Sequence, residues 1–481
     1  MNVSSPDASG GLASGGQPEG GAASDRATMW LDSTHARRSA WSFLCLAAAF
    51  ALIAPRARAN GAFPDEFSVH FPPNASQRIL LGTNFGLLVS EDTGATWRYS
   101  CEPYVTTGSS AALSAENVNF YQITKDGVIL AASNDITRSS DVGCTWPRSS
   151  GFVAGSIVAD MFPDPNDATL VYAIVYASDG SGSAIVASHD GGKAFDATRL
   201  HTTPDLLKGI EASRSTPGVV YATQVSAAGS SPTLLRSTDW GASWTALALT
   251  ASALTTPRIL EVDPRDANTV YLRMYTGTTD SIVVTTDGGH TFQTALAIQG
   301  FLTSFLHASD GALYAGMLEG NLYVRPAGAT SFTLHPGPRL RCLGQRPGTS
   351  RVYACGDMFL DGFSLGTSDD GGLTFQPLMK FTDLKGPLDC ASVQTACAAH
   401  WDRIQQVLGI AGSADAGAPA PDGGTSGMGR GSNCSSVGGD WVAALGLLAI
   451  GLRTILRKAG GCSVEPGRSS SFTPKLAKSA S

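Results

Sequence analysis

Short apolar runs alternate with clusters of turn residues along most of this chain. From about residue 67 to residue 381 the runs are rich in Val, Ile, Leu and Tyr, and Gly, Asp, Asn and Pro gather between them. One stretch shows the pattern well, with runs at 258–262, 269–273, 281–285 and 291–294. Apolar runs of this length, bounded by turn residues, predict β-strands, here four to a unit.

A second pattern repeats with the strands. The spelling Ser/Thr-x-Asp-x-Gly-x-Thr/Ser-Trp/Phe, called a box below, starts at residue 90 and returns with small variations at 139, 188, 237, 285 and 368, and a worn copy stands at 325–332. Its Asp, Gly and aromatic positions are Asp92, Gly94, Trp97, Asp141, Gly143, Trp146, Asp190, Gly192, Phe195, Asp239, Gly241, Trp244, Asp287, Gly289, Phe292, Asp370, Gly372 and Phe375.

The spacing of the boxes predicts the architecture. Successive boxes start 40 to 49 residues apart, and a repeat of that length with several strands is typical of a β-propeller. We therefore expect an all-β fold, a single seven-bladed propeller of four-stranded blades over residues 60–385. Each box should form the hairpin between the third and fourth strands, with the Gly at positive φ and the aromatic packed between sheets.

The start of the chain predicts an export signal. Residues 1–28 are rich in Gly, Ser and Ala and lack apolar periodicity, so we expect disorder and a true start at Met29. A basic pair at 37–38, an apolar run at 40–54 and a small-x-small site then predict a signal peptide cleaved after Ala59. A retained anchor is the alternative, although the apolar run is short for a span.

The end of the chain predicts a helix, a spacer and an apolar segment. Residues 386–410 have helical apolar spacing, and the helix either lies against the ring or merely leads onward. Residues 411–433 are a flexible linker, residues 434–460 carry Cys434 and a short apolar helix followed by Arg and Lys, and residues 461–481 are a disordered tail. We expect the apolar helix to anchor the protein to a membrane.

The nine cysteines indicate an oxidising compartment. Cys342 and Cys355 flank one hairpin, Cys390 and Cys397 stand close together in the predicted helix, and Cys101 and Cys144 lie in successive repeats. We predict disulfides Cys342–Cys355, Cys390–Cys397 and Cys101–Cys144, with buried thiols as the alternative.

The net charge and the motifs of the chain exclude several classes of function. The formal net charge of −7 argues against nucleic acid as a partner. Zinc motifs, phosphate loops and dinucleotide fingerprints are absent from the sequence, and the Asp-Gly-Gly turns lack the spaced ligands of a calcium loop. We predict no cofactor, no metal and no assigned catalytic residue.

The boxes resemble the Asp-box, or BNR, repeat of sialidases, sortilin-like receptors, xyloglucan-cleaving glycoside hydrolases and photosystem II assembly factors. The resemblance covers about two thirds of the chain and implies the propeller fold, while one fold hosts many activities. The C-terminal segment resembles the surface-sorting signals of myxobacteria, which implies sorting or lipidation at Cys434.

Few residues in the sequence support the enzyme hypothesis. The sialidase arginine motif has only a poor counterpart at Arg258, in the fifth repeat. A glycosidase needs two carboxylates across a cleft, and the candidate acids recur at equivalent repeat positions, which favours structural roles; they are Asp160, Asp164, Glu211, Glu261 and Asp263.

We expect an exported, surface-anchored propeller that binds or scaffolds a protein or glycan partner. The contacts should come from loops on the face away from the boxes, such as residues 177–183 and 226–232. The alternatives are a glycoside hydrolase or sialidase-like enzyme, and an assembly factor for a membrane complex.

Overall fold

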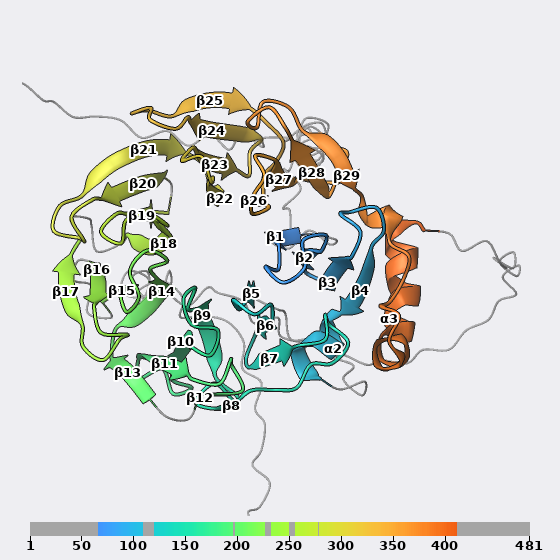
Figure 1. Ribbon diagram of the computed structural model, residues 1–481, viewed down its shortest axis with the longest axis horizontal. Helices are drawn as coiled ribbons and strands as arrows, with labels where there is room; N and C mark the ends of the chain where they lie inside the picture. Colours follow the sequence, from blue (N-terminus) through green and yellow to red (C-terminus); the bar gives the residue numbers. More distant parts are fainter. Residues whose placement is uncertain are drawn as a thin grey trace, which may run out of the picture. The chain divides into compact units, whose positions relative to one another are not determined.

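The computed structural model describes residues 66–108, 120–195, 198–226, 232–249, 255–277 and 279–410. Their strands form eight sheets, of which seven are arranged as blades in a ring around a central axis and the eighth is a two-stranded sheet (Figure 1). The first strand of each blade lies nearest the axis, and the chain passes from one blade to the next around the ring. The predicted seven-bladed β-propeller is confirmed.

The strands follow chain order within the blades. Blade 1 holds β1 (Glu66–His70), β2 (Ile79–Thr83), β3 (Gly86–Ser90) and β4 (Arg98–Cys101); blade 2 holds β5 (Phe120–Ile123), β6 (Ile129–Ala132) and β7 (Ile136–Ser139); blade 3 holds β9 (Ile157–Pro163), β10 (Val171–Tyr176), β11 (Ser183–Ser188) and β13 (Thr198–Thr203). Blade 4 holds β14 (Leu206–Ala212), β15 (Val220–Val225), β16 (Thr233–Ser237) and β17 (Thr245–Ala248); blade 5 holds β18 (Thr256–Val262), β19 (Val270–Tyr275), β20 (Thr279–Thr285) and β21 (Gln293–Gln299). Blade 6 holds β22 (Leu302–His307), β23 (Leu313–Met317), β24 (Asn321–Arg325) and β25 (Thr333–Pro336); blade 7 holds β26 (Cys342–Gln345), β27 (Val352–Cys355), β28 (Leu365–Ser368) and β29 (Gln376–Met379).

Blade 2 is the irregular blade. Its fourth position is occupied by a single bridge between Thr137 and Arg148 instead of a full strand. The chain then forms the two-residue strand β8 (Ser150–Gly151), which pairs in parallel with β12 (Ala194–Phe195) of the next repeat. Short helix α2 (Glu102–Thr107) follows blade 1.

The core lies between the blades, which explains why the second strands are apolar on both faces. In β19, Val270, Leu272 and Met274 pack in one cluster with side chains of blade 4. Tyr271, which points the other way, belongs to a cluster with blade 6. The second strands therefore read as nearly continuous apolar runs.

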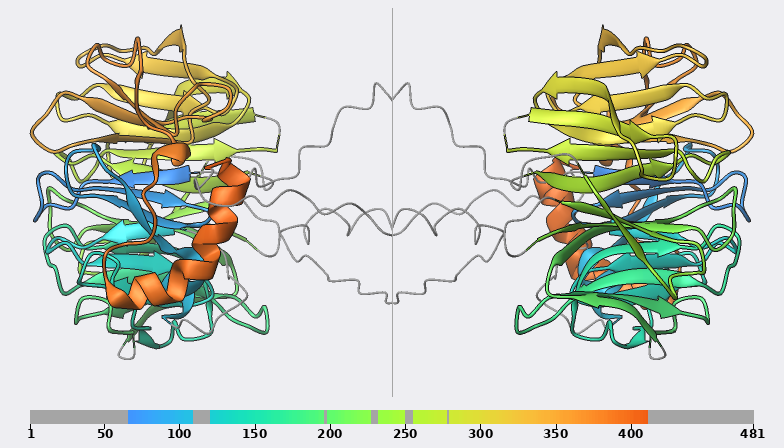
Figure 2. Two further views of the ribbon diagram at one scale, coloured as in Figure 1. Left: turned by 90° about the vertical axis from the view of Figure 1, so that its right-hand side faces the viewer. Right: turned by 90° about the vertical axis from the view of Figure 1, so that its left-hand side faces the viewer.

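The ring closes through residues near the end of its described chain, because within residues 66–410 blade 1 shares no strand with blade 7. After η1 (Phe381–Asp383), the chain runs beside β4 as a parallel edge: Lys385 N–H donates to the Trp97 carbonyl at 2.9 Å, and Leu388 N–H donates to the Tyr99 carbonyl at 2.9 Å. Helix α3 (Ala391–Leu408) then lies along the outside of the ring near β4 and α2 (Figure 2). Residues 385–408 are called the clasp below.

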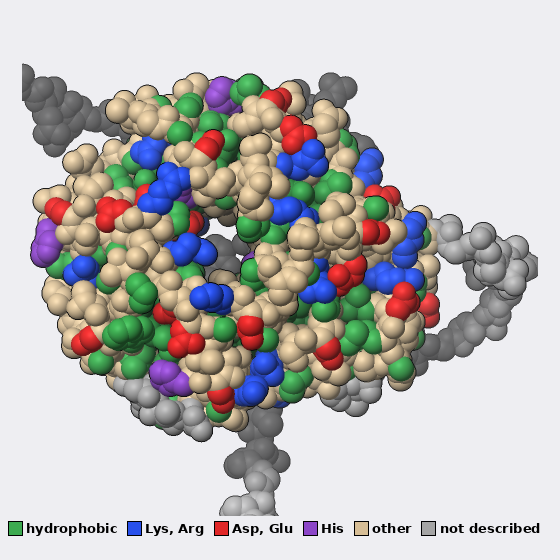
Figure 3. Space-filling view, in the orientation of Figure 1, with side chains coloured by type: hydrophobic (Ala, Val, Ile, Leu, Met, Phe, Trp, Pro, Cys, Tyr) green, Lys and Arg blue, Asp and Glu red, His purple; other side chains and the backbone are tan. Residues whose placement is uncertain are grey.

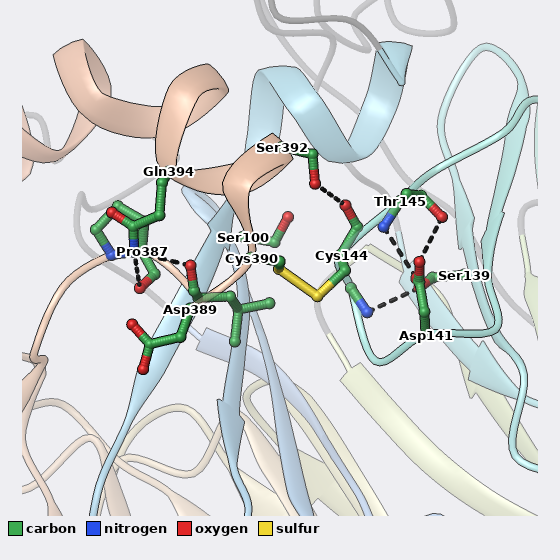
Figure 4. The surroundings of a disulfide bond; sticks show 12 residues. Ser100, Ser139, Asp141, Cys144, Thr145, Pro387, Asp389, Cys390, Ser392 and Gln394 are labelled. Carbon is green, nitrogen blue, oxygen red and sulfur yellow. Dashed lines mark hydrogen bonds between the residues drawn. A yellow bond between two sulfur atoms is a disulfide. The ribbon is translucent and has the colours of Figure 1, made fainter.

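Two disulfides join the clasp to the blades. Cys397 bonds to Cys101 at the end of β4, with 5.6 Å between the Cα atoms, and Cys390 bonds to Cys144, with 5.9 Å. Figure 4 shows the second bond beside the box turn that contains Cys144. The third disulfide is Cys342–Cys355, which joins β26 to β27 as predicted.

The predicted pairs Cys390–Cys397 and Cys101–Cys144 are therefore wrong. Cys390 is the N-cap of α3 and Cys397 lies seven residues further on, which places their Cα atoms about 10 Å apart along a helix axis. A disulfide needs about 7 Å or less. The helix instead presents one cysteine to each of two blades.

Several predictions lie outside the described residues. They are the leader and signal peptide at 1–59, the linker at 411–433, Cys434 with the segment 434–460, and the tail at 461–481. Among the residues that the structure describes, no helix combines the length and the apolarity needed to cross a membrane.

Candidate functional site

The six well-kept boxes form the same hydrogen-bonded turn. In the first, the Ser90 hydroxyl donates to Asp92 Oδ1 at 2.8 Å and accepts from Gly94 N–H at 2.8 Å. Asp92 Oδ1 accepts from Thr96 N–H at 2.8 Å, and Asp92 Oδ2 accepts from the Thr96 hydroxyl at 2.7 Å. These bonds hold the pKa of Asp92 below its usual range. The aspartate uses its oxygens within its own turn.

The box glycines also join neighbouring blades. Each takes a positive φ, +100° at Gly94 for example, and a Cβ there would meet a leucine of the preceding blade. The closest leucine carbons would lie at 2.6 to 3.2 Å, and the pairs are Gly94 with Leu378, Gly143 with Leu388, Gly192 with Leu130, Gly241 with Leu200, Gly289 with Leu247 and Gly372 with Leu322. In the second pair the leucine comes from the clasp. The boxes thus have structural contacts at every position that the repeat preserves.

The two ends of the ring differ in the loops they carry. Box turns lie at the same end as the turns between first and second strands, since Gly191 N–H donates to the Thr169 carbonyl at 2.8 Å. In antiparallel blades, the hairpins between second and third strands and the links between blades must lie at the other end. We call the two ends the box face and the opposite face.

Carboxylates on the inner strands connect neighbouring blades. Asp160 Oδ2 accepts from Ile210 N–H at 2.9 Å, and Glu211 Oε1 accepts from Val262 N–H at 2.9 Å. Asp164 and Asp263, at equivalent turns, accept N–H groups of their own turn residues. Four of the five acids considered from the sequence therefore have structural roles.

Glu261 departs from this arrangement. It lies beside Glu211 on the adjacent inner strand, and burial raises the pKa of Glu261 to about 7 while the Arg214 guanidinium opposes that rise. Burial, and then the negative charge of Glu261, raise the pKa of Glu211 well above its usual range. The structure thus brings together two carboxyl groups that the repeat pattern had suggested were separate structural residues.

Arg258 Nη1 donates to the Lys208 carbonyl at 3.1 Å. Burial raises the pKa of Asp160 to about 6, and the positive charge of Arg258 opposes that rise. Several Lys and Arg side chains lie around the opening of the ring (Figure 3). Within the described residues, no group of His, Cys, Asp or Glu side chains is placed to hold a metal ion.

The opposite face carries a large pocket of about 680 Å³. It lies between the link that follows β8, the hairpin between β10 and β11, and the end of β13. Phe152, Val175 and Pro204 contribute apolar lining, and Asp179 and several serines contribute polar groups. The predicted contact segment 177–183 lies almost wholly in this lining; of 226–232, only the two end residues are described.

The opposite face also displays a rigid apolar loop, residues 357–362, called the finger below. Phe359 and Leu360 at its tip are 70% and 50% exposed. Asp357 Oδ1 accepts from the N–H groups of both, at 2.9 and 3.0 Å. Asp361 Oδ2 accepts from the N–H groups of Asp357 at 2.9 Å and Arg339 at 3.0 Å.

The finger is also fixed at its base. Cys355, which is bonded to Cys342, lies two residues before the finger, and Gly356 N–H donates to the Ser364 carbonyl at 3.2 Å. These contacts hold the loop in one conformation without a bound partner. Exposure of the Phe359 and Leu360 side chains to water is nevertheless unfavourable. The repeat pattern did not point to this feature.

Comparisons with known proteins find propellers of similar fold. No protein-family model matches the chain, and no curated protein matches it. Solved structures that resemble it include YCF48 bound to D1 peptide, with 17% identity over 46% of this chain and 66% of that chain and a TM-score of 0.32. Others are the GH74 xyloglucanase from Xanthomonas campestris, with 14% identity over 67% and 80% and a TM-score of 0.34, and an ancestral GH74 enzyme, with 15% identity over 65% and 48% and a TM-score of 0.40. At these identities and scores the similarity concerns the fold alone.

Proposed function

We propose that this chain is an exported, surface-anchored binding module that holds a protein or glycan partner against the opposite face of its propeller. The observation that carries the proposal is the opposite face itself, where the 680 Å³ pocket and the exposed, preordered finger both lie. A pocket of that size falls in the range of ligand sites. The boxes, in contrast, have their polar groups engaged within the fold.

A pocket-filling variant tests the proposal. Ala154 is exposed and lines the pocket, so Ala154→Trp should block it, while Ala327→Trp, at an exposed position in the worn box, is the matched control. The chain is applied to a glycan array and to an array of peptides, and the bound ligands are measured again with both variants. Loss of binding with Ala154→Trp alone supports the site. Silence on both arrays and no self-association would refute a binding module.

The disulfides support export. Three disulfides among the described residues suit a chain that folds in an oxidising compartment. The signal peptide, the apolar helix at 434–460 and the sorting role of Cys434, all of which are sequence predictions, complete the proposed route to the cell surface. Deletion of residues 433–458 should release the protein into the medium, and continued association with cells would contradict anchoring.

A glycoside hydrolase is the second candidate, and Glu211 and Glu261 favour it. Their carboxyl groups interact, and the pKa of Glu261, which burial raises to about 7, suits proton transfer near neutral pH. Hydrolysis of a panel of aryl glycosides should then fall at least 100-fold in both Glu211→Gln and Glu261→Gln. Equal background rates in the parent chain and both variants would dismiss the enzyme. An assembly factor for a membrane complex is a special case of the binding module.

A further inference from the structure

The two disulfides of the clasp lie in different surroundings. Cys101 and Cys397 are 1% and 0% exposed and belong to the apolar core cluster around blade 1 and α3. Cys144 and Cys390 are only half-buried, so solvent reaches part of both residues. The Cys342–Cys355 bond is buried like the first, because its cysteines are 5% and 0% exposed. Of the three described disulfides, Cys144–Cys390 is therefore the one that a dissolved reagent can approach while the fold is intact.

The repeat explains why Cys144 faces outward. It is the sixth residue of its box, between the glycine and the threonine. In the other five well-kept boxes the sixth residue is exposed, and these residues are Ala95, Lys193, Ala242, His290 and Leu373. The side-chain hydrogen bonds that fix the blade 2 box involve its other residues, namely Ser139, Asp141, Gly143 and Thr145. The box turn therefore does not depend on the Cys144 side chain.

Cys390 lies at the amino-terminal end of an 18-residue helix. It is the N-cap of α3, and its side chain makes no capping hydrogen bond. The free N–H groups of a first helical turn and the helix dipole favour negative charge at this end. The helix thus stabilises a Cys390 thiolate, which makes Cys390 the better leaving group of the two cysteines. The adjacent Asp389 carboxylate lies 3.0 Å from the Arg98 guanidinium, which offsets its charge, and the Asp141 carboxylate accepts hydrogen bonds within its own turn (Figure 4).

The clasp keeps other contacts when this bond breaks. The Ser392 hydroxyl donates to the Cys144 carbonyl at 2.6 Å (Figure 4). The buried Cys101–Cys397 bond holds α3 to blade 1 further along the helix. Loss of Cys144–Cys390 alone therefore leaves the ring closed and frees only the end of α3 that carries Cys390.

We propose that Cys144–Cys390 is a site of thiol–disulfide exchange with low-molecular-weight thiols. The incoming thiolate attacks Cys144 Sγ, the bond between the two protein sulfurs breaks, and Cys390 leaves as a thiolate. Cys144 then carries the small molecule as a mixed disulfide on the box face of blade 2. One disulfide replaces another, so the step needs no further oxidant or reductant. The clasp thus has two states, which dissolved thiols interconvert, and this inference is independent of the proposed binding function.

Reaction of the full chain with reduced glutathione tests the proposal. The folded protein is incubated at about pH 8, where part of the glutathione is thiolate. Samples are quenched with acid, free thiols are blocked with N-ethylmaleimide, and the cysteine peptides are measured by mass spectrometry. Glutathione should appear on Cys144 and the maleimide on Cys390, about 100-fold faster than either buried disulfide reacts. Equal rates at all three bonds, reaction only where guanidinium unfolds the chain, or glutathione on Cys390 in the earliest samples would overturn the proposal.

Hydrogen exchange of the modified chain tests the second state of the clasp. In the parent chain Gln394 N–H donates to the Cys390 carbonyl at 2.9 Å. Amides in this first turn of α3 should lose protection about tenfold after the reaction, whereas those beyond Cys397 should keep it. Loss of protection along the whole helix would mean that the ring opens with this bond, and no loss in the first turn would mean that the bond does not hold it. Either result would contradict the proposed two-state clasp.

Discussion

Releasing the clasp should destabilise the whole propeller and not only its edge, because no strand among the described residues is shared by blade 7 and blade 1. Three variants are compared, with the bonded cysteines replaced by alanine. One lacks the Cys101–Cys397 bond, one lacks the Cys144–Cys390 bond, and one lacks both. A fourth variant without Cys342–Cys355 is the control, since that bond lies within one blade.

The magnitude follows from the loops that the bonds close. Cys101–Cys397 spans 296 residues, which corresponds to about 6 kcal/mol of unfolded-state entropy. With that bond intact, Cys144–Cys390 closes only the 43 residues from 101 to 144 and the seven from 390 to 397, a loop of about 50 that is worth about 4 kcal/mol. The two bonds therefore close largely the same loop. When one bond is removed, the other still constrains most of that loop in the unfolded chain.

This nesting predicts a non-additive result. Each single loss should cost about 4 kcal/mol, and the double loss about 10 kcal/mol, which exceeds the sum of the single losses by about 1 to 2 kcal/mol. The control, across 13 residues, should cost about 3 kcal/mol. Strain in the native disulfides and burial of their sulfur atoms lower or raise the cost of each single loss. The extra cost of the double loss comes from the overlap of the two loops.

The assay is guanidinium unfolding without reductant, followed by tryptophan fluorescence. The core residues Trp97 and Trp146 lie in the boxes of blades 1 and 2, so their emission should report opening at the clasp. If the double variant loses no more stability than the control, contacts between β1 and β26 alone close the ring, and the reasoning is refuted.

Three further predictions concern single side chains. Thr93 is exposed and takes φ +61° at a position where three other boxes have Gly, so Thr93→Gly should raise the free energy of unfolding by about 0.5 to 1 kcal/mol in chemical denaturation, and a loss would contradict backbone strain there. Asp141→Ala removes a carboxylate that accepts three hydrogen bonds and should cost about 2 kcal/mol in the same assay, unless solvent replaces those bonds without loss. Glu261 has a folded-state pKa of about 7 against an ordinary 4.5, so the folded state holds the extra proton and stability should fall as pH rises between these values; Glu261→Gln should flatten that slope, and an unchanged slope would argue against the raised pKa.

The repeat made the fold predictable. A box fixes a hairpin through its own residues, so Asp92, Gly94 and Trp97 carry their structural role within one short stretch of sequence. The local hairpin of Cys342 and Cys355 was predictable for the same reason. Structural features that depend on residues close together in the sequence can therefore be predicted from the sequence.

Features that depend on ring closure could not be read in this way. Cys101 and Cys397 are 296 residues apart, and only the folded ring places them together. The helix geometry alone could have excluded Cys390–Cys397, because the same residues that predicted the helix fix the spacing of the two cysteines. The correct partners required knowledge of where the helix lies.

For the candidate site, the sequence predicted only which face of the ring would carry it. Glu211 and Glu261 meet because adjacent blades put their inner strands side by side, which equivalent repeat positions can suggest. A local sequence pattern does indicate the finger, because Asp357 and Asp361 flank an apolar tip between two strands. Exposure of Phe359 could not be inferred, because an apolar residue in a loop is as often buried beneath it.

The contiguity of each blade has an evolutionary consequence. Every described sheet that contains an inner strand is built from one uninterrupted stretch of the chain, with no strand borrowed from the far terminus. A gene could therefore gain or lose a whole repeat by duplication or deletion without leaving an incomplete blade behind. The part that would have to adapt is the clasp, because it grips blades 1 and 2 by two fixed sulfur positions and must reach them from whichever blade comes last. Selection on the number of blades in such a ring would thus act first on the length and reach of its closing segment.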